Sequence, residues 1–290
     1  MERRERVLTT FRALACVVFA LVSQTAWSQS VTAADTRLMI SLSGKQYDLA
    51  ARVYRPDGPG HGPFPLIVVN HGTPTDRRKL PQARLSFARA AKWFAGHGYM
   101  VVVALRPGFG SSSGAYLEAS GRCGNEDFVA AGRRTAAIES AIVTAASHLP
   151  GADPERIVVI GQSAGGFGAI TLGGTPPSGV RGIISFAGGR GSNGKERICA
   201  GEDKLIAAER ELGAANSLPQ LWLYADNDHY FRKDLARRMF GAFADASRAP
   251  VTFVPLPAFG DNGHATFAKA DPQVWAEPVA AFLTQVLKDK

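Results

Sequence analysis

Short apolar runs rich in valine and isoleucine alternate along the chain with longer segments of mixed polarity. The apolar runs predict strands at 66–70, 99–105, 156–161, 180–186, 219–224 and 251–254. The longer segments predict helices at 84–96, 127–148, 203–213, 230–246 and 274–288. Strands that are apolar throughout are buried on both faces. The alternation therefore predicts an α/β fold, with a mostly parallel central sheet and helices on both of its faces.

The region before the first of these strands has a different pattern. Residues 38–42 and 49–54 predict an antiparallel hairpin at one edge of the sheet. After residue 28, no linker, repeat or low-complexity tract divides the chain, so residues 29–290 are expected to form one domain. The segment 187–217 is too short for a large lid, so loops 107–125 and 188–202 should shape a fairly open pocket.

The first 28 residues have the pattern of a secretory signal peptide. Four arginines lie before residue 13, an apolar stretch covers 13–22, and the small residues Ala26 and Ser28 follow. We expect cleavage after Ser28 and export to the periplasm or the medium. The apolar stretch is too short for a permanent membrane anchor. Cys16 does not indicate lipidation, because the apolar stretch continues beyond it.

The net charge and the spacing of possible metal ligands limit the partners that the chain is expected to bind. The formal charge is +8, and the first 28 residues contribute four arginines and two glutamates, which leaves +6 on the remainder. This excess is spread along the chain without a basic run, so it does not indicate nucleic-acid binding. No pair of histidines or cysteines has the spacing of metal ligands, and we expect neither a metal nor another cofactor.

The strand predicted at 156–161 leads into Gly-Gln-Ser-Ala-Gly at 161–165. A serine between two glycines, where a strand meets a helix, is typical of a nucleophile elbow, a sharp turn that exposes the hydroxyl. A serine hydroxyl needs a base that takes its proton and an acid that orients the base. Ser163 is therefore the candidate nucleophile.

The candidate acid and base follow Ser163 in the chain. The strand at 219–224 is followed by two acids, Asp226 and Asp228, and the strand at 251–254 by a glycine-rich loop with His264. The order serine, acid, histidine favours His264 as the general base. Asp228 is preferred as the orienting acid, with Asp226 as its rival. His229 adjoins Asp228 too closely to pair with it and is expected to lie in solvent or at the pocket rim.

Acyl transfer also needs donors for the oxyanion of the tetrahedral intermediate. The N–H of Ala164, directly after the nucleophile, is one expected donor, and the N–H of Thr73, after the strand at 66–70, is the other. His71 lies in the same turn, where it either binds substrate or, by preference, bonds to the backbone. Arg106 ends the next strand, where it either meets a substrate carboxylate or forms a structural salt bridge.

These motifs resemble those of the α/β-hydrolases. The chain is similar to dienelactone hydrolase-like and prolyl-oligopeptidase-related serine hydrolases from about residue 40 to its end. The matching motifs are His-Gly at 71–72, Arg-Pro-Gly-Phe-Gly-Ser-Ser at 106–112, the serine motif at 161–166, residues 224–228 and Gly-His at 263–264. The resemblance implies the triad Ser163, Asp228 and His264, with Thr73 and Ala164 at the oxyanion hole. Dienelactone hydrolases proper use a cysteine nucleophile, so the serine argues against their substrate.

Cys123 and Cys199 are the two cysteines that remain after the signal peptide, and both lie in loop-like sequence. An even count in an exported chain favours a disulfide between them over two unrelated buried thiols. The sequence thus predicts an exported serine hydrolase that cleaves small-molecule carboxylic esters through an acyl-enzyme. The alternatives are a peptidase or amidase of the oligopeptidase type, and a binding protein that keeps the fold without turnover.

Overall fold

The computed structural model describes residues 30–57 and 62–288. The predicted signal peptide, residues 1–28, lies outside the described residues. The strands are β1 (Val31–Leu42), β2 (Lys45–Pro56), β3 (Phe64–Asn70), β4 (Met100–Ala104), β5 (Ala152–Gln162), β6 (Val180–Phe186), β7 (Gln220–Ala225) and β8 (Val251–Leu256). The α-helices are α1 (Ala88–Gly96), α2 (Phe128–Ser147), α3 (Ala164–Leu172), α4 (Glu202–Ala215), α5 (Lys233–Ala246), α6 (Thr266–Lys269) and α7 (Ala276–Val286). Three short 3₁₀ segments are η1 (Arg77–Gln82), η2 (Gly263–Ala265) and η3 (Pro272–Val274).

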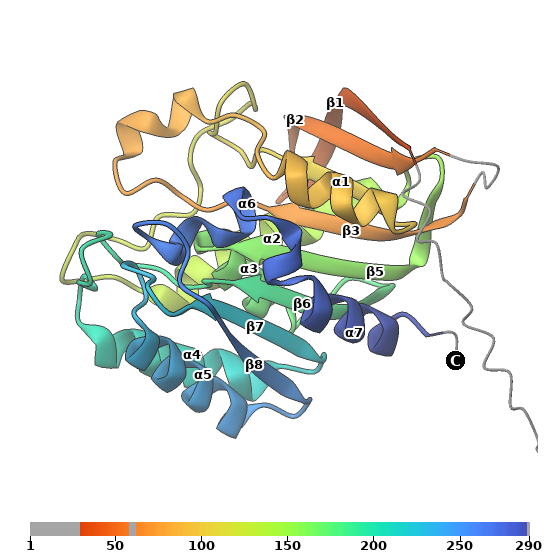
Figure 1. Cartoon of the computed structure of the whole chain (residues 1–290). Helices are drawn as coiled ribbons and strands as arrows, with labels where there is room; N and C mark the ends of the chain where they lie inside the picture. Colours follow the sequence, from red (N-terminus) through yellow and green to blue (C-terminus); the bar gives the residue numbers. More distant parts are fainter. Residues whose placement is uncertain (1–29, 58–61, 289–290) are drawn as a thin grey trace, which may run out of the picture.

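The strands form one eight-stranded sheet in the order β1-β2-β4-β3-β5-β6-β7-β8. Strands β3 to β8 are parallel to one another, while β2 is antiparallel to both β1 and β4. The mostly parallel sheet and the antiparallel edge hairpin are therefore confirmed (Figure 1). The hairpin is longer than predicted, because the outer half of β1 is polar and mostly exposed and gives no apolar signal.

Helices cover both faces of the sheet and create two separate cores (Figure 1). Val68 of β3 packs with residues of α2, α3, α4 and α5 on one face. Its neighbours Ile67 and Val69 pack with residues of α1 and α7 on the other face. Successive strand residues point to opposite faces, so a strand that faces both cores must be apolar at every position.

The segment between β6 and α5 does not form a domain over the sheet. After a loop at 187–201, α4 buries Leu205 and Leu212 in the core that it shares with α2 and α5. Helix α1 begins at Ala88, later than predicted, because Phe87 directly before it has a left-handed backbone with φ of 65°, which a right-handed helix does not contain. Among the described residues, no helix combines the length and the apolar character that a bilayer crossing requires.

Glu209 of α4 makes the stability of the fold depend on pH. The side chain is fully buried, and neither carboxylate oxygen has a partner among the described residues. Burial raises the pKa of this carboxyl well above its ordinary value, because a charged group loses its hydration. Between the ordinary and the raised pKa, the unfolded state releases the proton and the folded state keeps it. This group therefore lowers stability by about 1.4 kcal/mol per pH unit in that window.

We expect Glu209→Gln to raise the free energy of unfolding at pH 8. This gain should disappear near pH 4, about the ordinary pKa of a glutamate, where the folded and unfolded states both hold the proton. Urea unfolding at the two pH values measures the difference. Glu211→Gln is the matched control, because Glu211 is an exposed residue of the same helix. An equal effect of Glu209→Gln at both pH values would contradict the assignment.

Candidate active site

Ser163 lies in a strained turn between β5 and α3. Its backbone has φ of 56° and ψ of −124°, a conformation that is unfavourable for a residue with a side chain. A Cβ added at Gly161 would lie 2.2 Å from the carbonyl oxygen of Gly165, and one added at Gly165 would lie 2.4 Å from the carbonyl oxygen of His71. Neither position has room for a side chain. The two glycines therefore permit the turn, and the elbow shape expected from the sequence is present.

Asp228 and His264 form a hydrogen-bonded pair on the loops after β7 and β8. Nδ1 of His264 lies 3.0 Å from Oδ2 and 3.2 Å from Oδ1 of Asp228. Asp228 is 1% exposed, and its Oδ1 also accepts the backbone N–H groups of Tyr230 and Phe231 at 2.7 and 3.1 Å. When Nδ1–H donates to the carboxylate, the neutral ring keeps the lone pair on Nε2 for a reacting group.

The rival acid and the second histidine lie elsewhere. Oδ1 of Asp226 is 2.9 Å from Nζ of Lys233 in a partly exposed ion pair. The exposed ring of His229 has its Nδ1 2.7 Å from Oε1 of Glu196, and this hydrogen bond raises the pKa of His229. The structure thus pairs Asp228 with His264, and His229 faces solvent as expected.

Three contacts fix His264 beside the elbow. The ring of Tyr230 stacks on the imidazole with centroids 3.9 Å apart and planes inclined by 18°. Gln162, the residue before Ser163, donates from Nε2 to the carbonyl oxygen of His264. Oδ1 of Asn262 accepts the backbone N–H of His264 at 3.0 Å. Both the backbone and the ring plane of His264 are therefore held in place next to the serine turn.

The expected oxyanion donors lie at the same pocket as the serine. Thr73, Ala164 and Ser163 line one cavity of about 130 Å³. Ala164 is the first residue of α3, so its N–H has no acceptor within the helix. A Cβ added at Gly72 would lie 3.0 Å from Cβ of Ser163, which shows how closely the loop after β3 approaches the elbow.

The two loops expected to shape this cavity do so. Loop 107–125 contributes Tyr116 and Ser120, and loop 188–202 contributes residues 189–192. Other lining residues were not anticipated, because their side chains reach the pocket only through the folded arrangement of loops: Pro74, Thr75, Arg77, Tyr230 and Phe231. A second cavity, of about 490 Å³, adjoins His264, and Tyr230 lines both cavities.

A family model for the X-Pro dipeptidyl-peptidase (S15) family matches residues 44–201, more than half of the chain. The chain belongs to the S15 family. The matched region contains Ser163, Cys123 and Cys199, while Asp228 and His264 lie beyond it. A comparison with curated protein sequences finds no match.

Solved structures with the same fold include esterases and peptidases. A putative dienelactone hydrolase from Klebsiella pneumoniae is 16% identical, with 88% of this chain and 99% of that chain covered and a TM-score of 0.55. An esterase from Pyrococcus furiosus is 13% identical, with 93% and 96% covered and a TM-score of 0.58. A puromycin-hydrolyzing peptidase from Mycobacterium tuberculosis is 20% identical, with 93% of this chain but 41% of that chain covered and a TM-score of 0.59. This member of the S15 family therefore has the α/β-hydrolase fold of serine hydrolases.

Arg106 and His71 of this S15 family member bond to each other and to the surrounding protein. Arg106 is fully buried, with Nε 2.6 Å from Oε1 of Glu118 and Nη1 donating to the carbonyl oxygen of His71. Nε2 of His71 accepts the N–H of Arg106 at 3.0 Å, and Nδ1 lies 2.7 Å from the carbonyl oxygen of Gly72. Burial, and then the charge of Arg106, lower the pKa of His71 to about 3, so its ring is neutral. Both residues make structural contacts, as preferred for His71 and as one of the two options for Arg106.

A buried charge cluster behind the pocket was not predicted. Glu118 is fully buried and binds Arg106 on one side and Arg190 on the other, with Oε2 of Glu118 3.2 Å from Nη2 of Arg190. Burial alone raises the pKa of Glu118, but the two guanidinium groups outweigh it and lower the pKa to about 2. Glu118 lies 12 residues from Arg106 and 72 from Arg190, so no local pattern indicates the cluster.

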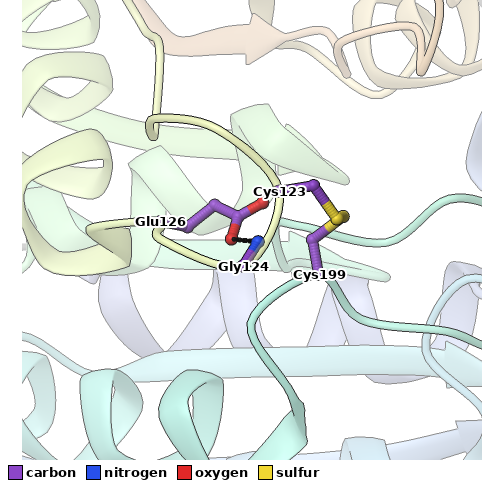
Figure 2. Close-up of a disulfide and its surroundings, with 4 residues drawn as sticks. All are labelled: Cys123, Gly124, Glu126 and Cys199. Carbon is purple, nitrogen blue, oxygen red and sulfur yellow. Dashed lines mark hydrogen bonds between the residues drawn. A yellow bond between two sulfur atoms is a disulfide. The ribbon is translucent and has the colours of Figure 1, made fainter.

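The predicted disulfide joins Cys123 and Cys199, with their Cα atoms 4.9 Å apart (Figure 2). Cys199 also donates its backbone N–H to the carbonyl oxygen of Gly191, a residue of the pocket wall. The carboxylate of Glu126 accepts the N–H of Gly124 next to the bridge (Figure 2). The bridge therefore ties together the two loops that line the cavity beside Ser163.

Proposed function

We propose that this chain is an exported serine hydrolase that cleaves carboxylic esters, with Ser163 as nucleophile, His264 as general base and Asp228 as the orienting acid. The observation that carries the proposal is the Asp228–His264 hydrogen bond, held directly beside the strained turn of Ser163. Nucleophile, base and orienting acid are the parts that a serine hydrolase requires.

The reaction begins when Nε2 of His264 takes the proton of the Ser163 hydroxyl, and Oγ adds to the ester carbonyl carbon. The oxyanion of the tetrahedral intermediate accepts hydrogen bonds from the N–H groups of Ala164 and Thr73. When the intermediate collapses, His264 gives its proton to the leaving alcohol oxygen, the ester C–O bond breaks, and the acyl group stays on Ser163.

Deacylation repeats these steps with water in place of the serine. His264 takes a proton from the water, the hydroxide adds to the acyl carbon, and His264 returns the proton to Oγ of Ser163 as the acid product leaves. Throughout, Asp228 keeps Nδ1 protonated and stabilises the imidazolium that forms in each half of the reaction. The reaction needs no group from outside the chain except water.

The charge of the cavity supports an ester over an amino-terminal dipeptide. An enzyme that removes dipeptides from a free amino terminus has to accept an ammonium group, for which carboxylates are the usual partners. Among the described residues that line the cavity there are two arginines, Arg77 and Arg190, and no carboxylate. These arginines repel an ammonium group. A peptidase or amidase is the second candidate, and membership of the S15 family is the observation that favours it.

The disulfide supports export. Cysteine pairs persist in compartments outside the reducing cytosol, and the Cys123–Cys199 bridge agrees with the secretory pattern of the first 28 residues.

The decisive experiment starts from the full-length chain expressed in a bacterium with a periplasm. The amino terminus of the recovered protein is sequenced, and the protein is then treated with a fluorophosphonate probe, a panel of alkyl esters and an X-Pro anilide. We expect Gln29 as the first residue, labelling by the probe, and turnover of the esters at higher kcat/KM than the anilide.

Each result has its own meaning. If all of the recovered protein still carries residues 1–28, the result argues against export but not against the esterase activity. Higher kcat/KM for the anilide establishes the peptidase. Folded protein that neither labels nor turns over any substrate supports the non-catalytic alternative.

A further inference from the structure

Two arginines, Arg77 and Arg190, line the cavity beside Ser163. They differ in whether their terminal nitrogens are free to bind a ligand. Arg190 is 6% exposed, and both terminal nitrogens of its guanidinium are engaged, while its buried Nε has no partner among the described residues. Its Nη1 donates to the carbonyl oxygen of Glu118 and to the hydroxyl of Tyr116, and its Nη2 donates to Thr135 and to Glu118. Arg190 therefore contributes charge to the cavity wall but has no free donor on either terminal nitrogen for a ligand.

Arg77 is available. It is exposed at the start of η1, and its guanidinium carbon lies 5.1 Å from the centroid of the Tyr116 ring. In the described part of the chain, no carboxylate forms an ion pair with Arg77, whereas the next residue, Arg78, is paired with Asp76. The ring of Tyr116 supports the guanidinium of Arg77 at the cavity, and the hydroxyl of Tyr116 is fixed by Arg190.

The buried cluster adds a positive background to this wall. It contains two guanidinium groups, those of Arg106 and Arg190, against the ionised carboxylate of Glu118. Glu139, which also lies close to these charges, has no hydrogen-bond partner for its carboxylate in the described structure, and burial raises its pKa well above the ordinary value. In this cluster two guanidinium groups share the one carboxylate of Glu118.

The position of His264 tells which part of a substrate enters the cavity. His264 gives its proton to the leaving alcohol, so the alcohol lies on the His264 side, where the cavity of about 490 Å³ is found. The acyl group is then assigned to the cavity of about 130 Å³, which Ser163, Ala164, Thr73 and Arg77 line. A cavity of this size accepts a short acyl group.

We infer that the acyl cavity recognises a short acyl chain that ends in a carboxylate, and that Arg77 is the residue that determines this specificity. The substrate class is the half-ester of a short dicarboxylic acid, such as a glutarate monoester. The inference rests on the proposed esterase function and extends it to the acid part of the substrate.

The test compares benzyl hemiglutarate with benzyl 4-carbamoylbutanoate, in which a neutral amide replaces the carboxylate at nearly equal size. Released benzyl alcohol gives kcat/KM for each ester. We expect the wild-type protein to prefer the carboxylate about tenfold, as a charge-assisted hydrogen bond allows. Arg77→Gln should reduce the ratio to about one by slowing the hemiglutarate, while Arg77→Lys retains part of it.

Arg78→Gln is the matched control, because Arg78 is the adjacent exposed arginine, paired with Asp76, and does not line the cavity. This variant should keep the wild-type ratio. A ratio near one in the wild-type protein, or an unchanged ratio in Arg77→Gln, overturns the inference and leaves the esterase standing.

A binding measurement separates this inference from the proposed function. Calorimetric titration of the Ser163→Ala variant with benzyl hemiglutarate needs no turnover. We expect binding to weaken about tenfold when Arg77→Gln is added to Ser163→Ala. Equal affinity in the two variants overturns the inference, even if none of the esters is hydrolysed by the wild-type protein.

Discussion

Ser163→Ala should lower kcat for ester hydrolysis by roughly 10⁵- to 10⁶-fold, the loss expected when the nucleophile of a serine triad is removed. The alanine retains the Cβ, so the strained backbone of the elbow and its contact with Gly72 remain. The effect should therefore fall on turnover, with little change in the free energy of unfolding. Steady-state kinetics and urea unfolding of the same preparation measure both quantities.

Ser120→Ala is the control for this variant. Ser120 lines the same cavity but belongs to the disulfide-linked loop rather than to the elbow. We expect this variant to keep kcat within a few-fold of wild type. If Ser163→Ala retained wild-type kcat in a preparation free of contaminating esterase, the assignment of the nucleophile would be wrong.

Asp228→Asn should lower kcat by about 10⁴-fold, while Asp226→Asn should leave it nearly unchanged. An asparagine at 228 has nearly the size of the aspartate, but it removes the negative charge that keeps Nδ1 of His264 protonated. Asp226 pairs with Lys233 at the surface, where exposed ion pairs contribute little to stability.

The two variants decide between acids that lie two residues apart. kcat measured for both variants in one assay is the readout. A large loss in Asp226→Asn with normal activity in Asp228→Asn would reverse the assignment. Large losses in both, accompanied by lower stability, would indicate damage to the whole loop.

The sequence predicts the sheet, its helices and the edge hairpin, because burial on two faces imposes apolar runs that are visible without a structure. It also predicts the turn at Ser163, since the packing there excludes every residue except glycine at positions 161 and 165. The choice between Asp226 and Asp228 depends on which carboxylate accepts the N–H groups of Tyr230 and Phe231. Such a bond depends on the path of the loop, which apolar patterns do not determine.

The orientation of the Arg106 side chain also could not be predicted from the sequence. An arginine just after a strand of the central sheet suggests either a ligand for a substrate carboxylate or a structural salt bridge, and Arg106 follows β4 as expected. Its side chain turns inward, where Glu118, later in the same loop, is a buried charge partner. Arg77, by contrast, lies in a segment without a catalytic motif and reaches the cavity only through the fold.

The bridge between Cys123 and Cys199 also has a topological consequence. It closes a covalent ring of chain that contains Ser163, while Asp228 and His264 lie outside that ring. The exposed residues Lys195, Glu196 and Arg197 lie inside it. A protease that cuts at these residues opens the ring but releases no fragment, so the nucleophile and its two partners stay on one molecule until the disulfide is reduced.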